Sequence, residues 1–470
     1  MRYASWDEFM TEPATQAILR PIVDFVTAER HAQLAGCRCA AVVKHHGLET
    51  FPNSNDVFRF TATGASVVDI YLNGKLAVPG LAYRKGTGNI VVDAGDYTIA
   101  VRPAGAPVNS APVFSTQASV ARDSRTLFVA YGRLADSGLD TAFTLKPFPF
   151  GAPDATAGQV RLIHASTGAP SMDIANGNSK VLGSTVAGSA TSFSKLAADL
   201  PANTRLGLRP ANGTTDLVFA TVPTALGKGA VVNLIAFGEI NPAVPDDQFL
   251  AVSTLDEATG KLTDLTTEIN TAAALPNVNV LFFHAAADVG NVDLGPPGAK
   301  LAANLGFRKA STLVSSIRPG STRLELRPAN NATVTRAENL KFLPGMNWLV
   351  YARGLASGSG ASALDIDAAP LVAKDAQSRA RVIHASADAP AVDIASGDTV
   401  LVSGLTYPRQ SPFVPLPPTG LPTTTLNVRT AGTTTNLYGV TVTAAVTSAS
   451  AGNNTTIFAL GRVGAAANAT

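Results

Sequence analysis

Short apolar runs in which every second residue is hydrophobic recur along the chain after its first fifty residues. In one such run, Leu206 and Leu208 alternate with residues that a core does not need. A period of two with one apolar face predicts antiparallel strands that cover a core on one side. Turn-forming residues separate the runs, and Asn73-Gly74 between two of them predicts a tight β-hairpin. The pattern therefore predicts an all-β chain of many short strands.

Three anchor residues recur in the same order in four stretches of the chain. An Asp between apolar residues comes first, an Arg that closes an alternating strand follows 33 to 36 residues later, and a Gly after an apolar strand follows 27 to 32 residues after the Arg. The Asp anchors are Asp69, Asp173, Asp293 and Asp393, the Arg anchors are Arg102, Arg209, Arg327 and Arg429, and the Gly anchors are Gly132, Gly238, Gly354 and Gly461. Such regularity indicates one small fold built four times.

Each stretch has the length and the strand spacing of an immunoglobulin-like β-sandwich. We therefore predict four tandem antiparallel β-sandwich domains over 51–150, 158–256, 277–370 and 378–464. The connecting segments are rich in Pro, Ala, Asp and Thr. The longest of them, 255–277, is predicted to be a short helix or an exposed linker.

The first fifty residues have a different pattern. Ser5 and Glu8 have the spacing of a capping box, and apolar residues near helical spacing follow, which predicts one or two amphipathic helices over 5–35. Leu34 to Cys37 has the form of a bacterial lipobox, whose cysteine receives lipid, although charged residues occupy the place of the apolar region before it. Residues 1–50 are therefore predicted to be a short helical or export-related segment, with Cys37 as a candidate lipid anchor.

Composition narrows the functional classes. Hydrophobic residues make up 46% of the 470 residues and charged residues only 15%, which suits packed cores and excludes intrinsic disorder. A net charge of +2 gives no concentrated basic surface, so nucleic-acid binding is not expected. No stretch has the ~20 consecutive apolar residues of a membrane span. The phosphate-binding, zinc-protease and nucleophile-elbow motifs are absent from the sequence, so no cofactor and no catalytic residue is predicted.

The phrase H-A-S-x-D-A-P-x-V-D-I at His384 to Ile394 resembles the signature of a bacterial family known as domain of unknown function 4397. The segments His164 to Ile174 and His284 to Leu294 are looser copies. The first stretch departs furthest, with Thr61 in the place of the His and a loop one residue shorter. The resemblance covers about 56–464 and implies an exported or envelope-attached β-sandwich, often in tandem. The family has no assigned activity, so the resemblance implies a fold and a location but no reaction.

Recurrent pairs of His and Asp are the first candidates for chemistry. The pairs are His164 with Asp173, His284 with Asp293, and His384 with Asp393, each nine residues apart. If the intervening loop brings them together, an oriented imidazole could act as a base or as a metal ligand. In the structural alternative, the His bonds its own loop and the Asp accepts backbone N–H bonds at a turn. No nucleophile and no third ligand recurs with the pair, so the structural role is preferred.

The four recurrent Arg residues also have two interpretations. A row of cations, one in each repeat, would recognise an acidic surface glycan. Alternatively, each Arg lies over its sheet and pairs with the Asp of its own repeat or with a carbonyl. Because these Arg residues come late in a strand and just before turn-like segments, the structural interpretation is preferred here too.

Tandem repetition without recurrent catalytic groups favours a non-enzymatic cell-envelope or secreted protein with a structural, adhesive or weak multivalent binding role. The alternative is a carbohydrate- or metal-binding module that uses the His/Asp loop of each repeat. The sequence does not identify the partner, and a surface glycan and an envelope protein are both candidates. The expected location, in the bacterial envelope or outside the cell, depends on the family resemblance.

Overall fold

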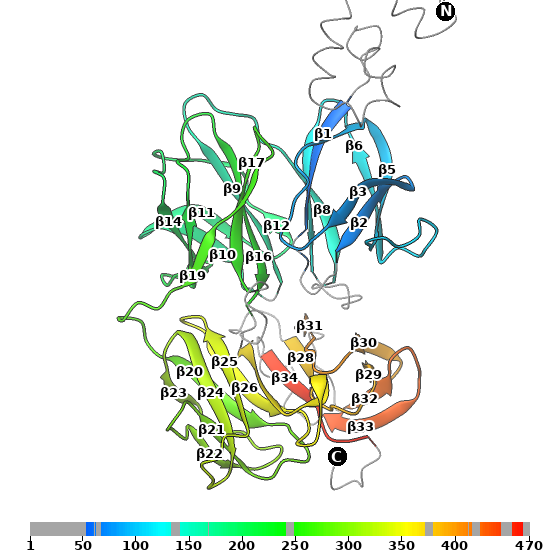
Figure 1. Cartoon of the computed structure of the whole chain (residues 1–470), viewed down its shortest axis with the longest axis vertical. Coiled ribbons are helices and arrows are strands. Elements are labelled where there is room, and N and C mark those ends of the chain that lie inside the picture. Colours follow the sequence, from blue (N-terminus) through cyan, green and yellow to red (C-terminus); the bar gives the residue numbers. More distant parts are fainter. Residues whose placement is uncertain are drawn as a thin grey trace, which may run out of the picture. The chain divides into compact units, whose positions relative to one another are not determined.

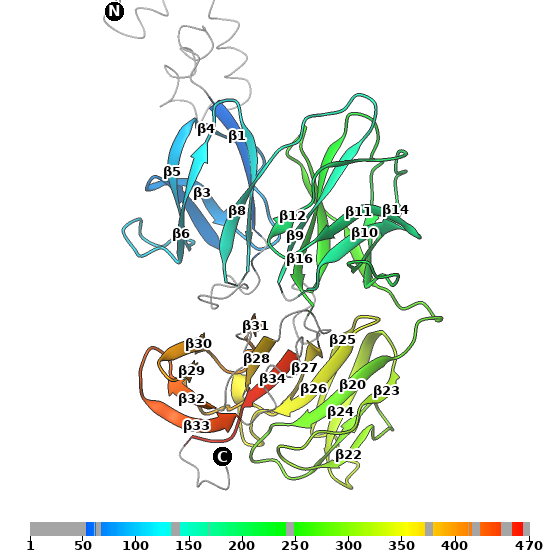
Figure 2. The same cartoon turned by 180° about the vertical axis from the view of Figure 1, so that it is seen from behind.

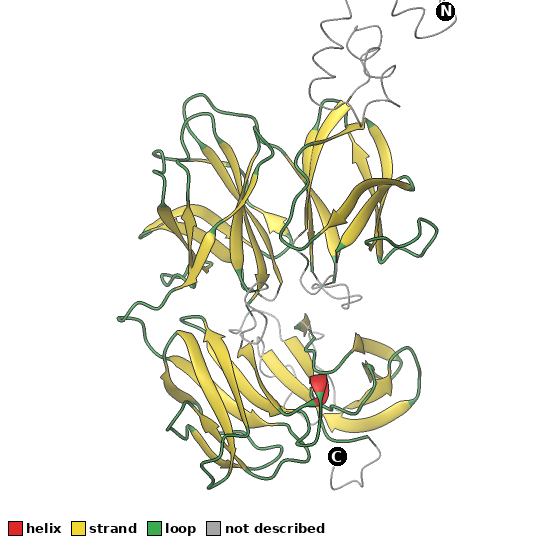
Figure 3. Ribbon diagram, viewed as in Figure 1, coloured by secondary structure: helices red, strands yellow, loops and turns green. Residues whose placement is uncertain are grey.

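The computed structural model describes residues 53–60, 62, 67–132, 142–167, 169–240, 249–371, 379–411, 413–415, 424–442 and 454–463. The described residues divide into a small unit, which comprises 53–55, 91–96 and 119–124, and a large unit, which holds the rest. The helical element among the described residues is a single 3-10 turn, η2 (Gly360–Ser362), and strands dominate the rest (Figure 3). The all-β prediction is confirmed. The helices predicted within 1–50 and Cys37 lie outside the described residues.

The strands of the first half of the chain form two sets, here called repeat 1 and repeat 2. Repeat 1 contains β1 (Asn53–Phe60), β2 (Val68–Leu72), β3 (Lys75–Leu81), β4 (Ile90–Asp93), β5 (Gly95–Pro103), β6 (Phe114–Val120), β7 (Arg125–Tyr131) and β8 (Thr144–Pro149). Repeat 2 contains β9 (Gln159–Thr167), β10 (Met172–Asn176), β11 (Ser179–Thr185), β12 (Ser189–Ala190), β13 (Ser194–Lys195), β14 (Thr204–Pro210), β15 (Val218–Val222), β16 (Val231–Glu239), β17 (Ala251–Asp256), β18 (Leu262–Asp264) and β19 (Thr266–Ile269).

The second half forms repeat 3 and repeat 4 (Figure 1). Repeat 3 contains β20 (Val278–His284), β21 (Val292–Gly295), β22 (Ala302–Leu305), β23 (Val314–Ile317), β24 (Gly320–Pro328), β25 (Arg336–Phe342), β26 (Asn347–Arg353) and β27 (Asp365–Leu371). Repeat 4 contains β28 (Arg379–His384), β29 (Val392–Ser396), β30 (Thr399–Leu405), β31 (Val414–Pro415), β32 (Thr424–Thr430), β33 (Asn436–Val442) and β34 (Asn454–Ala459).

Two sheets make up each repeat, named here after the anchors that they carry. The His sheet holds the strand that ends near the recurrent His, and its orders are β12-β9-β16-β17-β18 in repeat 2, β23-β20-β26-β27 in repeat 3 and β31-β28-β34 in repeat 4. The Asp sheet holds the Asp anchor, and its orders are β3-β2-β5-β6, β11-β10-β14-β15-β19, β22-β21-β24-β25 and β30-β29-β32-β33. The sandwich prediction is confirmed at this level.

One strand pair in the His sheet of repeats 2, 3 and 4 is parallel. The alternating pattern predicted antiparallel strands and gave no sign of this pair. Strand β9 runs parallel to β16, β20 to β26, and β28 to β34. Figure 2 shows β9 beside β16 and β20 beside β26 from behind. The first strand of a repeat thus pairs with a strand about seventy residues further on, which closes each repeat on itself.

The core of each repeat lies between its two sheets and follows the period of two. In β20, Val280 and Phe282 are fully buried and alternate with partly buried residues. Trp348 of the neighbouring strand is also fully buried and meets the edge of Phe342, with ring centroids 5.6 Å apart. Each such side chain contributes about 1.5–3 kcal/mol by leaving water. The predicted hairpin turn is also present, because Asn73 (φ 49°) and Gly74 (φ 77°) join β2 to β3.

The segment 255–277 was predicted to be a short helix or an exposed linker, and this prediction is wrong. The segment contains β18 and β19, and β19 pairs with β15 at the edge of the Asp sheet of repeat 2. Thr266, Thr267 and Ile269 are β-branched residues, which favour strands, and the sheet supplies hydrogen bonds that an isolated segment lacks. Repeat 2 therefore continues beyond residue 256, to the end of β19.

The alignment of repeat 1 at Thr61 needs a correction as well. Arg59 bridges Gly86, in the same way that Phe283 bridges Ala310 and Ile383 bridges Gln410. In this register Phe60 occupies the position that His284 and His384 hold in their repeats. Phe60 precedes Asp69 by nine residues, the same separation as between His and Asp in the other repeats. The loop is therefore not shorter, and Thr61 itself lies outside the described residues.

Candidate functional site

Each anchor Asp lies directly opposite its anchor Arg on the neighbouring strand of the Asp sheet. The register pairs Asp69 with Arg102, Asp173 with Arg209, Asp293 with Arg327, and Asp393 with Arg429. The near-constant spacing in the sequence is thus the length of chain needed to leave one strand, form the outer hairpin and return alongside it.

The anchor carboxylate joins two turns of its own repeat. In repeat 4, Asp393 Oδ1 accepts the N–H of Gly404 at 2.6 Å, and Oδ2 accepts the N–H of Gly432 at 2.8 Å. In repeat 3, Asp293 accepts the N–H groups of Asn304 at 2.8 Å and Asn330 at 3.2 Å. All four donors have a positive φ, between 52° and 72°. Gly and Asn tolerate this conformation best, so the carboxylate fixes two left-handed turns through their backbones.

Repeats 1 and 2 use the same arrangement with small changes. Asp69 accepts the N–H groups of Gly80 at 2.7 Å and Gly105 at 2.9 Å. Asp173 accepts the N–H of Asn212 at 3.0 Å, but its other oxygen accepts the hydroxyl of Ser184 at 2.8 Å. The same clamp is therefore present in all four repeats.

Among the residues that the structure describes, a lysine pairs with the anchor carboxylate in the two central repeats alone. Lys180 lies 2.9 Å from Asp173, and Lys300 lies 2.6 Å from Asp293. Burial by itself would raise the pKa of both carboxyls, but the ammonium and the backbone N–H groups outweigh it and lower the pKa below its usual value. Leu76 occupies the register position of Lys180 in repeat 1, as Val400 does in repeat 4. The clamp thus does not require a cation.

Each recurrent His is fully buried and bonds its own loop. Its Nε2 donates to the carbonyl oxygen six residues ahead: Pro170 at 2.9 Å, Gly290 at 3.0 Å and Pro390 at 3.0 Å. In repeats 2 and 3, Nδ1 faces the N–H two residues ahead, that of Ser166 or Ala286, at 3.3 Å. Burial lowers the pKa of all three imidazoles, which favours the neutral ring.

The structure does not combine the His and the Asp into one site. His164 belongs to the His sheet and Asp173 to the Asp sheet, and the hydrogen bonds of the two side chains lead to different loops. Within the part of the chain that the structure describes, no three His, Cys, Asp or Glu side chains gather closely enough to hold a metal ion. The His and the Asp of a repeat therefore belong to separate sets of hydrogen bonds.

The anchor Arg residues are buried, with exposed fractions of 8–9%, and they bond within their own repeats. Arg209 Nε donates to Asp216 at 2.8 Å and its Nη2 to the carbonyl of Gly177 at 2.7 Å. Arg429 makes the matching bonds, to Asn436 at 3.0 Å and Gly397 at 2.6 Å. Arg102 donates to the carbonyl of Ser110, and Arg327 to Glu325. They do not form an exposed cationic row.

The Gly anchor completes the pattern. Gly132, Gly238, Gly354 and Gly461 all have a positive φ, between 88° and 114°. In repeats 2 and 4 the carbonyl of this Gly accepts the hydroxyl of the Ser in H-A-S, Ser166 at 2.8 Å and Ser386 at 2.9 Å. The recurrent residues therefore form a set of bonds that fixes the loops at the end of each sandwich.

The chain matches a known protein family over most of the region that carries the anchors. The model of the family described as Domain of unknown function (DUF4397) matches residues 60–175, 278–395 and 378–470, which is more than half of the chain. The chain belongs to the DUF4397 family. Three matches do not by themselves establish four DUF4397 copies, and the family description assigns no activity.

Other comparisons add little to the DUF4397 assignment. No curated protein matches the chain. Among solved structures, the Bacillus anthracis TIE protein is similar at 10% identity over 86% of this chain and 67% of that one, with a TM-score of 0.13, which is too low to carry an argument. Among the described residues, no helix is long and apolar enough to cross a membrane.

A buried polar row in the His sheet of repeat 2 was not predicted from the sequence. Arg161 donates to Asn233, and Asn233 Nδ2 donates to Glu257 at 2.7 Å. Burial lowers the pKa of Arg161 to about 10 and raises the pKa of Glu257. The signal in the sequence was a charged residue inside an apolar strand. Asn233 lies 72 residues after Arg161, and Glu257 lies a further 24 residues along the chain. The sequence alone therefore could not show that the three residues meet.

Proposed function

We propose that this DUF4397 chain is a non-enzymatic tandem-repeat protein of the bacterial envelope or of the secreted fraction, with a structural, adhesive or weak multivalent binding role. The proposal is supported by the hydrogen bonds of the recurrent polar residues. The buried His, Asp and Arg anchors bond the loops of their own repeats, so they support a fold rather than face a substrate.

Repetition suits such a role. A weak site on each repeat gains affinity for a repetitive target, such as a glycan or an array of envelope proteins, without new contacts. The alternative use of the His/Asp loop for a carbohydrate or a metal has less support, because the His nitrogen that faces the loop already donates to a carbonyl. Location and the lipid anchor at Cys37 are part of the proposal.

Fractionation of the source bacterium tests the location. We expect the chain in the envelope or in the medium, and intact-mass measurement will show whether the mature chain begins at a lipid-modified Cys37. An unprocessed chain found only in the cytosol would contradict the proposal.

A triple substitution tests whether the recurrent His residues take a direct part in binding. The variant His164→Phe/His284→Phe/His384→Phe places at each position the residue that Phe60 supplies in repeat 1. If circular dichroism and the thermal unfolding of the whole chain match those of the wild type, so that repeats 2, 3 and 4 are all still folded, binding of the purified chain to isolated envelopes should equal that of the wild type. Loss of binding by the folded variant would mean that the His residues act directly.

A further inference from the structure

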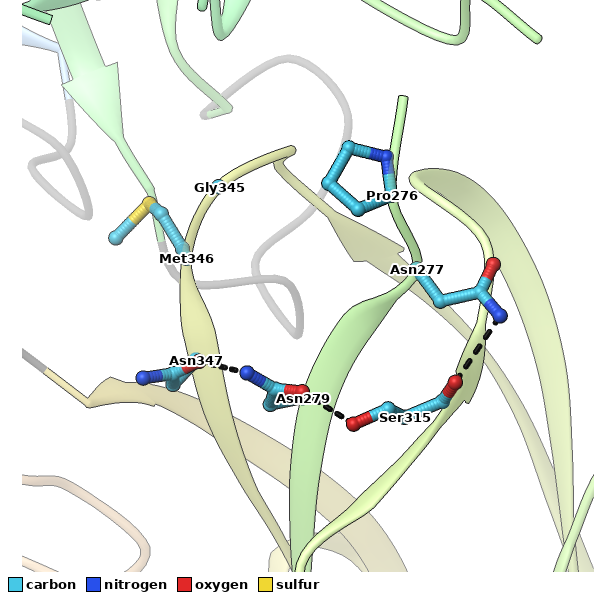
Figure 4. A pocket seen from close by; sticks show the side chains of 7 residues that line it. All are labelled: Pro276, Asn277, Asn279, Ser315, Gly345, Met346 and Asn347. Carbon is cyan, nitrogen blue, oxygen red and sulfur yellow. Dashed lines mark hydrogen bonds between the residues drawn. The ribbon is translucent and has the colours of Figure 1, made fainter. Parts of the chain in front are cut away.

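A small pocket opens on the His sheet of repeat 3, and none of the anchor residues lines it. Its cavity volume is about 410 Å³, and Pro276, Asn277, Asn279, Ser315, Gly345, Met346 and Asn347 line it. Figure 4 shows the polar side chains as a row across the adjacent strands β26, β20 and β23. The volume lies within the range of pockets that take small molecules.

The polar groups of this row are linked to one another. Asn279 Nδ2 donates to Asn347 Oδ1 at 2.8 Å, and Ser315 Oγ donates to Asn279 Oδ1. Asn277 Nδ2 donates to the backbone carbonyl of Ser315 at 3.0 Å (Figure 4). Each amide has two N–H donors and an oxygen with two lone pairs, so these bonds orient the row and leave donors and acceptors for a ligand.

The chemistry of the lining restricts the ligand. None of the seven lining residues carries a charge, so the pocket offers no Coulomb attraction to an anion or a cation. A row of amides and a hydroxyl, which both donate and accept, matches a neutral molecule with several hydroxyl groups. The lining contains no aromatic ring, so strong stacking is absent and the affinity should be low.

Repeats 2 and 4 lack this pair of Asn residues. Asn279 faces Asn347 across the parallel pair, whereas the same ladder position holds Gln159 facing Val231 in repeat 2 and Arg379 facing Asn454 in repeat 4. Asn is disfavoured in strands, so two facing Asn residues depart from the local preference of the sheet. Departures of this kind concentrate at functional sites.

We propose that the pocket formed by Asn277, Asn279, Ser315 and Asn347 is a binding site for a neutral carbohydrate. The site belongs to one repeat and uses none of the His, Asp or Arg anchors. This proposal goes beyond the structural, adhesive or multivalent role proposed above. If the pocket binds no sugar, that role is unaffected.

The test uses the full chain and a panel of neutral sugars: glucose, galactose, mannose, N-acetylglucosamine, maltotriose and chitotriose, with galacturonate as the charged comparison. Side-chain amide signals in a two-dimensional NMR spectrum follow the titration. We expect at least one neutral sugar to shift the signals of Asn279 and Asn347 with a dissociation constant on the order of 1 mM. Galacturonate should bind no better than galactose.

A matched pair of variants makes the test specific. Asn347→Val installs the residue that Val231 supplies in repeat 2, so the fold should tolerate it, and it removes the amide at the end of the row. We expect it to weaken binding at least about fivefold, the effect of one lost hydrogen bond. Asn339→Val changes an exposed Asn on β25, in the other sheet of the same repeat, and should leave binding unchanged.

Three results would overturn the proposal. They are no shift by any sugar up to about 50 mM, where millimolar binding would be visible, equal binding by the Asn347→Val variant, and a clear preference for galacturonate. In a Trp6→Phe background, fluorescence of the buried Trp348 confirms that repeat 3 of each variant is folded.

Discussion

Replacement of Asp293 by Asn tests whether the anchor carboxylate stabilises its repeat. The change keeps the size of the side chain but removes the charge. It also turns an NH2 group toward the N–H of Asn304 or Asn330, both of which the carboxylate now accepts. A hydrogen bond to a charged group contributes about 1.5–3 kcal/mol, and a donor left facing another donor costs about 1–3 kcal/mol. We therefore expect Asp293→Asn to destabilise repeat 3 by about 3 kcal/mol.

Trp348 makes the measurement local. The sequence has two Trp residues, Trp6 and Trp348, and Trp348 is fully buried in repeat 3. In a Trp6→Phe background, fluorescence during urea unfolding therefore reports repeat 3, even though a chain of this length will not unfold in one step. With a denaturant slope of about 1.5 kcal/mol/M, a loss of 3 kcal/mol lowers the midpoint by about 2 M.

Lys300→Leu is the matched control. Its side chain is 46% exposed, so the ion pair with Asp293 should contribute less than about 1 kcal/mol. Leu76 already fills the corresponding position in repeat 1. A midpoint shift below about 0.5 M for Asp293→Asn, or an equal loss for Lys300→Leu, would refute the view that the backbone clamp carries the stability.

The remaining predictions concern pH, the Gly anchor and metals. Burial lowers the pKa of His284 from 6.5, so the unfolded chain takes up a proton at a higher pH than the folded one. The contribution of the neutral ring to stability is complete above about pH 6.5 and is lost as the pH falls toward the folded pKa; in urea titrations followed by Trp348, His284→Phe should flatten this dependence, and an unchanged slope would contradict it. Gly354→Ala should destabilise repeat 3 by more than about 3 kcal/mol, because φ is 90° and the Ala363 carbonyl occupies the place of the new Cβ. Gly298→Ala, with a positive φ but open space, should cost only about 1–2 kcal/mol in the same assay. Because no metal-ligand cluster occurs among the described residues, EDTA or added Zn²⁺ should leave the melting temperature unchanged, and a shift of several degrees would reveal a site elsewhere in the chain.

The sequence predicted those parts of the fold that depend on neighbouring residues. Alternation gave the strands, and Asn73-Gly74 gave a hairpin that the structure contains. The parallel pair of each His sheet was not predicted, because it joins strands about seventy residues apart and leaves no local pattern. Strand β19 was missed for a similar reason, since its partner β15 lies some fifty residues earlier.

Some residues of the candidate sites were predicted from the sequence, and others were not. The preferred structural roles of His284 and Asp293 follow from the chemistry of their side chains beside a loop, and the structure places them in bonds of that kind. The amide row of repeat 3 was not foreseen. Asn279 and Asn347 are 68 residues apart, and each looks like an ordinary polar residue until the sheet brings the two together.

The anchor carboxylate has a practical consequence, because in three of the four repeats each of its two oxygens accepts a backbone N–H. Such a clamp accepts any loop that places Gly or Asn at two points, whatever its other residues are. Foreign peptides inserted between Gly432 and the following strand, or at the matching hairpin of another repeat, should therefore be displayed without loss of the sandwich that holds them.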